Sequence, residues 1–114
     1  MTDQEVRSII NLLKAHYPYF YNNITTKDQA NEIVEVWKIQ FEDIDYQLIK
    51  MAVLDWGKTK DKAPSIAELR RHIFNFYTTI EMELGTLRKD PNADKKRIEE
   101  LERWRNQAWD CKSR

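Results

Sequence analysis

The fold depends most on residues 64–80, which read PSIAELRRHIFNFYTTI. Ser65 and Glu68 have the spacing of a capping box, in which each side chain accepts a hydrogen bond from the other residue's backbone amide at a helix start. Beyond this start, apolar residues recur in alternating steps of three and four, at Ile66, Leu69, Ile73, Phe76 and Ile80. The pattern predicts one long helix, over about residues 66 to 88, whose apolar stripe buries the helices before it.

Three further helices are predicted before this stretch. Capping patterns at residues 2–5 and 26–29 predict two helix starts, and Asp43 or Asp45 can cap a third. Pro18 ends the first helix near residue 16, because it forces the preceding residue towards an extended backbone. Gly57 stands where a helix commonly turns into the left-handed conformation, so we expect the third helix to end there.

The chain continues beyond the long helix. A break at residues 90–92, which read DPN, precedes a strongly charged segment, Lys95 to Lys112, with a thin apolar side. The predicted fold is therefore all-α: a compact bundle of four helices with a long fourth helix and a C-terminal helical extension. We expect a helical N-terminal domain over residues 1–77 and the extension over residues 78–114.

The first predicted domain contains several aromatic residues. Trp37 and Trp56 lie on apolar helix faces, so we expect both in the core, with each indole N–H donating to a backbone carbonyl. The loop at residues 17–21 reads YPYFY. We expect these rings to tuck under the neighbouring helices, the alternative being exposure for a partner.

The extension carries the candidate partner-binding residues. Trp104 and Trp109 lie on a helix whose narrow apolar arc could hardly bury two indoles unless something covers it. One interpretation is a hairpin that packs on the long helix, and the other is an anchor that places Trp and Arg in a groove of a partner. Either way the candidate residues are Ile98, Leu101, Trp104, Arg105, Ala108 and Trp109.

Charge argues against nucleic acid as the main partner. The 114 residues carry 19 basic and 19 acidic side chains, whereas a dedicated nucleic-acid binder shows a basic excess. An alternative is a small DNA-binding regulator, whose weak phosphate contacts would come from Lys58, Lys60, Lys62, Arg70 and Arg71. The loop at residues 57–64 is too long for the turn of a helix-turn-helix, which weighs against this alternative.

Catalysis and cofactors find little support in the sequence. The two glycines stand alone, so no loop can cradle a phosphate, and neither histidine has a partner at metal-site spacing. The single Cys111 forms no internal disulfide and lies near the C-terminal end, where we expect fraying. We therefore expect no enzymatic activity and no cofactor. No apolar run is long enough to cross a membrane or act as a signal peptide, which favours a soluble cytoplasmic protein.

A set of landmarks resembles a known family. In chain order they are the run Tyr17 to Phe20, then Trp37, Phe41, Asp43, Ala52 and Trp56, then the run Pro64 to Arg70. Their order and spacing resemble the small helical proteins with which phages load, and also inhibit, a ring-shaped replicative helicase. The resemblance covers about residues 1 to 76.

The resemblance implies an adaptor of phage DNA replication in the bacterial host cytoplasm. Such a protein binds a hexameric replicative helicase stoichiometrically, inhibits it and delivers it to the origin. Residues from about 78 onward would contact the helicase, and the folded domain would meet the phage's origin-binding initiator. Self-association remains possible besides, because the stripe at residues 66–80 also satisfies heptad spacing.

Overall fold

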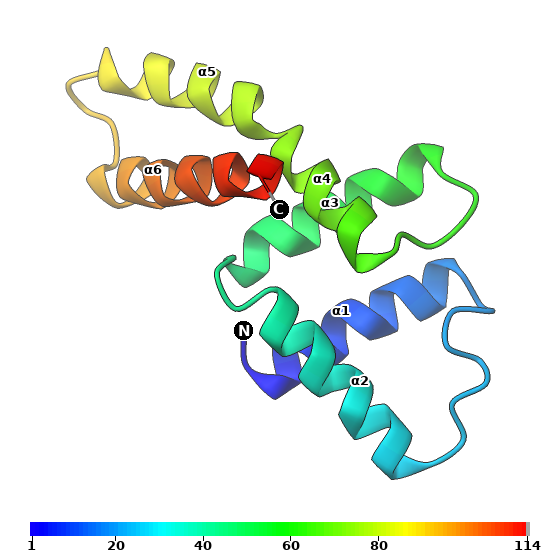
Figure 1. The fold of residues 1–114 in the computed structure, drawn as a ribbon. Coiled ribbons are helices and arrows are strands. Elements are labelled where there is room, and N and C mark those ends of the chain that lie inside the picture. Colours follow the sequence, from blue (N-terminus) through cyan, green and yellow to red (C-terminus); the bar gives the residue numbers. More distant parts are fainter. Residues whose placement is uncertain (114) are drawn as a thin grey trace. The chain divides into compact units, whose positions relative to one another are not determined.

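The computed structural model describes residues 1–113, which form helices and loops without any strand; Arg114, the last residue of the predicted extension, lies outside them. The all-α class is confirmed. Among the described residues there are six α-helices and a final 3-10 turn (Figure 1). The elements are α1 (Asp3–His16), α2 (Lys27–Gln40), α3 (Tyr46–Thr59), α4 (Ile66–Phe74), α5 (Tyr77–Arg88), α6 (Lys95–Asp110) and η1 (Cys111–Ser113).

The three predicted capping boxes are confirmed. At α1 the amide of Glu5 donates to Thr2 Oγ1 at 3.1 Å, and the amide of Thr2 donates to Glu5 Oε1 at 2.9 Å. The box at residues 26–29 starts α2 with the same two bonds, and the box at residues 65–68 starts α4. Each box satisfies two amides that the first turn of a helix leaves without a partner. Asp45 precedes α3 as predicted, although its side chain makes no capping hydrogen bond.

The prediction of one long helix over residues 66 to 88 is wrong. The chain forms α4 and α5 instead, separated by Asn75 and Phe76. The amide of Asn75 donates to the carbonyl of His72, and the amide of Phe76 donates to that of Ile73, each at 3.0 Å. These bonds reach back three residues, which is the tighter 3-10 geometry that ends an α-helix. The apolar repeat continues through the break, because the spacing of apolar residues reflects which positions are buried. It carries no information about where the backbone hydrogen bonds of one helix end and those of the next begin.

The predicted end of α3 at Gly57 is also wrong. The helix continues to Thr59, and no glycine has a positive φ. Gly57 serves close packing instead: a Cβ atom placed on it would lie 3.1 Å from Cε1 and Nε2 of His16. The missing side chain therefore lets the end of α1 approach α3.

The chain divides into two compact units, Met1–Leu69 and a second that begins at Arg70. The first unit holds α1, α2, α3 and the start of α4, and the second holds the end of α4, α5, α6 and η1. The boundary predicted from sequence lay eight residues later, between residues 77 and 78.

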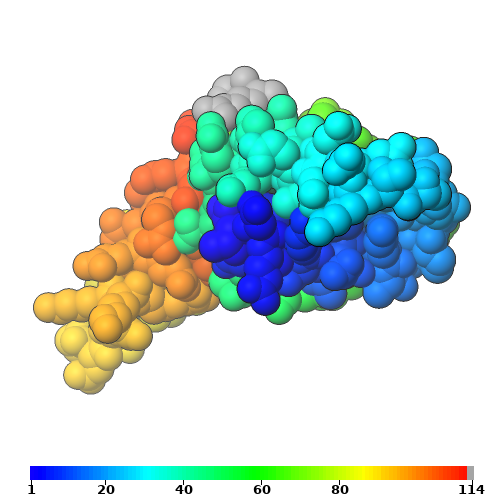
Figure 2. Space-filling view, turned by 90° about the horizontal axis from the view of Figure 1, so that it is seen from below, coloured from blue at the N-terminus to red at the C-terminus, as the bar shows by residue number. Residues whose placement is uncertain are grey.

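The core of the first unit forms around α1, which contacts both α2 and α3 (Figures 1 and 2). An ion pair between Lys38 Nζ and Asp3 Oδ1, 2.9 Å long, joins the end of α2 to the start of α1, so the two helices run antiparallel. Trp37 is buried as predicted, but its indole N–H donates to the Tyr21 hydroxyl at 3.1 Å, not to a backbone carbonyl. Buried side chains include Val6, Ile9, Leu13, Trp37, Phe41, Leu48 and Ile49.

Aromatic rings hold the loop between α3 and α4 in place. Tyr17 is buried and donates to the carbonyl of Lys60 at 2.7 Å. Trp56 is buried as predicted, and its indole N–H donates to the carbonyl of Lys62 at 2.8 Å. Tyr19 accepts from the amide of Ala63 at 3.1 Å. The expectation that the rings of residues 17–21 tuck under the helices is right for Tyr17 and wrong for Tyr19, which is 52% exposed.

The second unit contains an antiparallel hairpin of α5 and α6, joined by residues 89–94 (Figure 1). The Asp94 side chain caps α6 by accepting from the amide of Lys96 at 2.9 Å. Apolar side chains are buried on both helices, and so is Cys111, which corrects the expectation of a frayed end there. The buried residues of the hairpin are Ile80, Leu84, Leu101, Trp104 and Ala108.

Candidate partner-binding surface

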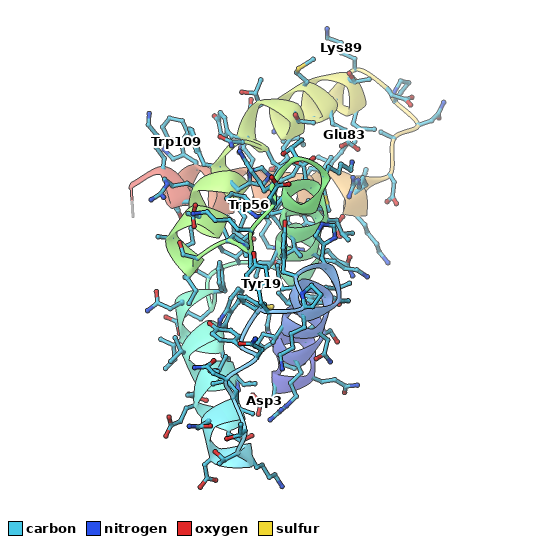
Figure 3. The ribbon with its side chains drawn as sticks, turned by 90° about the vertical axis from the view of Figure 1, so that its right-hand side faces the viewer. Asp3, Tyr19, Trp56, Glu83, Lys89 and Trp109 are labelled. Carbon is cyan, nitrogen blue, oxygen red and sulfur yellow. The ribbon has the colours of Figure 1, made fainter. Side chains whose placement is uncertain are left out.

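A partly exposed aromatic cluster lies at the open end of the hairpin, and we call it the hairpin-end patch. It consists of Phe74, Tyr77, Trp109 and Lys112. The ring centroid of Trp109 lies 5.0 Å from that of Tyr77 and 5.9 Å from that of Phe74. Trp109 remains 48% exposed despite these contacts. In Figure 3 it lies at the opposite end of the hairpin from Lys89.

A cation covers this aromatic cluster. The Nζ atom of Lys112 lies 4.9 Å from the ring centroid of Trp109 and 5.8 Å from that of Phe74. Phe74 and Tyr77 stack with their planes 13° apart. The patch therefore presents an apolar aromatic surface beside a positive charge, and Trp and Tyr are residue types enriched at the energetic centres of protein interfaces.

The structure separates the six candidate residues of the extension into two groups. Leu101, Trp104 and Ala108 are buried, so they belong to the packing of the hairpin. Trp109 is exposed in the patch, and Ile98 and Arg105 are half-buried. Arg105 Nε lies 3.3 Å from Glu81 Oε1 on α5, which ties α6 to α5. Among the six, Trp109 is thus the side chain that offers a large apolar surface to another molecule.

Arg97 explains how Trp104 is buried on so charged a helix. Its guanidinium carbon lies 5.3 Å from the centroid of the Trp104 ring, and its Nη2 atom lies 3.2 Å from Glu83 Oε1 on α5. Burial alone would lower the pKa of Arg97. The hydrogen bond to Glu100 and the charge of Glu83 outweigh that effect and raise the pKa. The guanidinium therefore stays charged and covers the indole while it bridges the two helices.

Sequence reasoning missed three members of the patch, Phe74, Tyr77 and Lys112. Phe74 and Tyr77 fall off the apolar stripe that predicted the long helix, and aromatic residues outside such a stripe are a signal of exposure. Their contact with Trp109 depends on the break between α4 and α5. An unbroken helix would have placed them differently.

The five basic residues of the DNA-binding alternative differ in their exposure to solvent. Lys58, Lys60 and Lys62 are exposed, and Lys60 Nζ lies 5.5 Å from the centroid of the Trp56 ring. Arg71 is exposed too, whereas Arg70 is only 5% exposed. Burial of Arg70 removes it from the cations that a phosphate could reach.

Within residues 1–113, no group of three or more His, Cys, Asp or Glu side chains is placed to hold a metal ion. Within the same range, none of the helices has the length and apolar character needed to cross a membrane.

Comparison with known proteins bears on the first unit. No curated protein and no solved structure matches the chain. The family model for the N-terminal domain of the phage gene 39 protein matches residues 1–70, more than half of the chain. All the landmarks from Tyr17 to Arg70 lie within the matched stretch. The chain therefore belongs to this family of phage helicase loaders and inhibitors.

Proposed function

We propose that this protein is a phage replication adaptor that binds a hexameric replicative helicase, holds it inactive and delivers it to an origin. Its family membership carries the proposal, because that family consists of helicase loaders and inhibitors. The chain would act by stoichiometric binding in the host cytoplasm, without catalysis and without a cofactor of its own.

The hairpin-end patch is the proposed helicase contact. It lies in the second unit, and all four of its members come after the matched residues 1–70. Its exposed indole, Trp109, and its half-buried Tyr77 are of the residue types that contribute most binding energy at interfaces. Leu101, Trp104 and Ala108 support the contact by holding α6 against α5.

An adaptor changes helicase loading only if it distinguishes the states of the helicase. A protein that bound every nucleotide state with equal affinity would coat the ring and shift no equilibrium. We therefore infer that affinity depends on the nucleotide bound to the helicase. Release at the origin then follows when the nucleotide changes or when the origin-binding initiator, the second proposed partner, competes.

The test is a titration of the purified hexameric helicase, with and without ATP, by calorimetry and light scattering. A variant lacking the hairpin-end rings, Tyr77→Ala with Trp109→Ala, is compared with Met82→Ala. Met82 is the matched control because it is 69% exposed on α5 but lies outside the patch. Point variants are preferable to removal of α6, since removal would expose the apolar side chains of α5.

We expect nucleotide-dependent binding by the natural chain, weakened about tenfold or more in the double variant, because two interface aromatics contribute at least about 1.4 kcal/mol together. The Met82 variant should bind within about twofold of the natural chain. Full affinity in the double variant would refute the patch assignment. No binding by the natural chain, with or without ATP, would refute the adaptor function.

The DNA-binding alternative is tested in the same preparation. Lys58 in the last turn of α3, and Lys60 and Lys62 just after that helix, are all exposed, which is the observation that favours it. Binding to duplex DNA that weakens steeply with salt, and that is lost on replacement of these three lysines, would support direct DNA regulation.

A further inference from the structure

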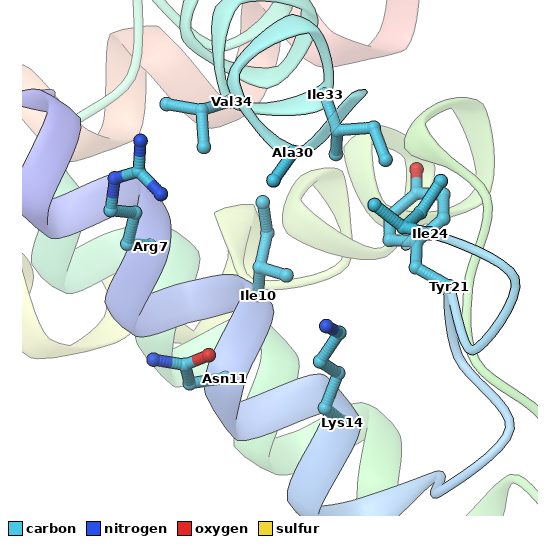
Figure 4. Close-up of a pocket in the computed structure, with 9 residues that line it drawn as sticks. All are labelled: Arg7, Ile10, Asn11, Lys14, Tyr21, Ile24, Ala30, Ile33 and Val34. Carbon is cyan, nitrogen blue, oxygen red and sulfur yellow. The ribbon is translucent and has the colours of Figure 1, made fainter. Parts of the chain in front are cut away.

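A small pocket opens between α1, α2 and the loop that joins them (Figure 4). Its volume is about 130 Å³. The apolar part of its lining comes from Ile10 on α1, Ile24 in the loop, and Ala30, Ile33 and Val34 on α2. The pocket lies wholly within the first unit, so it is distinct from the hairpin-end patch.

The size of this α1–α2 pocket limits what it can hold. Cavities for cofactors and drug-sized ligands measure roughly 300 to 1,000 Å³, more than twice this volume. An engineered apolar cavity of about 150 Å³ binds benzene. The α1–α2 pocket therefore suits one inserted side chain of the size of leucine or phenylalanine.

The charge at the pocket is of one sign. Arg7 and Lys14 both line it from α1, and no Asp or Glu lines it. Within residues 1–113, neither cation forms an ion pair with a carboxylate; Arg7 Nη2 donates instead to Asn31 Oδ1 at 2.7 Å, which holds it at the rim. The nearby Asp3 carboxylate pairs with Lys38 at 2.9 Å, and Lys38 and, to a smaller extent, Arg7 lower its pKa, so one negative charge is shared between these two cations. Two cations beside an apolar pocket favour an anionic occupant.

One wall of the pocket is held in an unusual conformation. Tyr21 has a φ of 53°, the left-handed region that bulky residues rarely adopt. Its hydroxyl accepts from the Trp37 indole at 3.1 Å, and its ring lies 4.2 Å from that of Phe20, so packing fixes the strained residue. Strain of this kind is retained chiefly at binding and catalytic sites. This feature is independent of the charge and keeps the loop wall of the pocket in one place.

We propose that the α1–α2 pocket docks an acidic segment of a partner protein, which inserts one leucine- or phenylalanine-sized side chain between α1 and α2. Carboxylates on either side of that side chain lie against Arg7 and Lys14. A basic segment would be repelled by the same two cations. This contact gives the N-terminal unit its own partner site, whatever the hairpin-end patch binds.

The proposal is tested with three short probes, the capped peptides EEFE, EEAE and KKFK, added to the full chain labelled with nitrogen-15. Amide shifts report the site directly. EEFE should give saturable shifts at residues around Ile10, Ile24 and Ile33. EEAE, which keeps the charge but lacks the ring, should bind about tenfold more weakly or not at all, because burial of the apolar ring favours binding. KKFK should give no shifts there.

Two variants separate the apolar contribution from the electrostatic one. Ala30→Leu fills the pocket from α2 and should weaken EEFE about tenfold. Lys14→Met keeps the apolar stem but loses the charge and should weaken it about two- to fivefold. Lys27→Met removes a charge from an exposed position of α2 outside the pocket and is the matched control, expected within about twofold of the natural chain. Thermal unfolding of each variant verifies that it is folded.

Several results would overturn the proposal. Absence of saturable EEFE shifts would refute the docking outright. Equal affinity of EEFE and EEAE would show that charge attraction alone accounts for binding and that no side chain enters the pocket. Shifts confined to another region, or unchanged affinity in a folded Ala30→Leu variant, would exclude the pocket as the site. Shifts of the pocket amides with protein concentration alone would assign the pocket to a second copy of this chain.

Discussion

The Tyr17 hydroxyl donates a hydrogen bond to the backbone carbonyl of Lys60, at 2.7 Å, and so connects the end of α1 to the loop that follows α3. The two partners lie 43 positions apart in the sequence. Because the carbonyl belongs to a lysine-rich loop with no regular structure, this bond fixes a segment that would otherwise depend on few contacts.

Replacement of Tyr17 by phenylalanine should therefore lower stability. The ring stays and the hydrogen bond is lost, so we expect a decrease of about 1 kcal/mol in the free energy of unfolding. Denaturant titration measures it. Tyr46→Phe is the control, because the Tyr46 hydroxyl makes no hydrogen bond within residues 1–113; its effect should stay below about 0.5 kcal/mol. Equal effects of the two replacements would show that the bond contributes nothing.

The Tyr17 hydroxyl should lose its proton at a higher pH than an ordinary tyrosine does. Burial raises the pKa of Tyr17 above its ordinary value of 10.0, and Tyr19 and Asp61 raise it further. The folded state thus holds the proton more tightly than the unfolded state. The stabilisation is fully present below about pH 10 and is lost as the pH rises through the folded-state pKa. The difference in tyrosinate absorbance between the natural chain and Tyr17→Phe should develop above about pH 10 when folded and near that pH in denaturant. Coincident curves would contradict the shift.

Gly85→Ala should stabilise the hairpin. Gly85 lies inside α5, and an added Cβ would meet no atom within 4 Å. Alanine is preferred over glycine in a helix interior by about 1 kcal/mol, so the free energy of unfolding should increase by about that amount. The temperature of thermal unfolding should rise accordingly. A lower unfolding temperature would mean that the site is more crowded than the structure shows.

Gly57→Ala should increase stability less than Gly85→Ala does, although Gly57 also lies in a helix. Its new Cβ would lie 3.1 Å from the His16 ring, which has to move to make room. The clash offsets much of the roughly 1 kcal/mol that alanine contributes in a helix. Adding His16→Ala removes the clash, so the double variant should be more stable than the two single effects predict. Additive effects would show that the ring does not constrain residue 57.

Arg97→Met should destabilise the hairpin more than Arg88→Met does. Arg97 contacts Glu83, Glu100 and the Trp104 ring, whereas Arg88 pairs within the described part of the chain with Glu102 alone, at 3.7 Å. We expect a loss of about 1 kcal/mol for Arg97 and under about 0.5 kcal/mol for Arg88, both pairs being partly exposed. Denaturant unfolding at low salt and at about 1 M salt measures the difference, which should shrink as salt screens the ion pairs.

Helix starts were predictable from the sequence because capping is local. Thr2, Thr26 and Ser65 each bind an amide three residues away. The break at Asn75 was not predictable, since neither proline nor glycine marks it. The hydrogen-bond partner of Trp37 was missed for a related reason: it depends on Tyr21 in a backbone conformation that tyrosine rarely adopts.

The candidate surface was half predictable. Trp104 and Trp109 lie five residues apart, which places them about 140° apart around an α-helix, so one can be buried while the other faces outward. Both tryptophans were identified as candidates from the sequence, but the sequence did not show which of them is buried and which is exposed. Phe74 and Tyr77 were missed because their contact with Trp109 exists only after α4 ends and α5 begins in a new direction.

The burial of Cys111 makes the single thiol of this chain a reporter of local opening. A thiol reagent reaches its sulfur only when η1 detaches, because the side chain is 0% exposed. The labelling rate, divided by that of a fully exposed thiol, gives the equilibrium constant for this opening under native conditions. A partner seated on Trp109 and Lys112 would hold the same segment closed. Slower labelling would then measure occupancy of the hairpin end without any label attached to the partner.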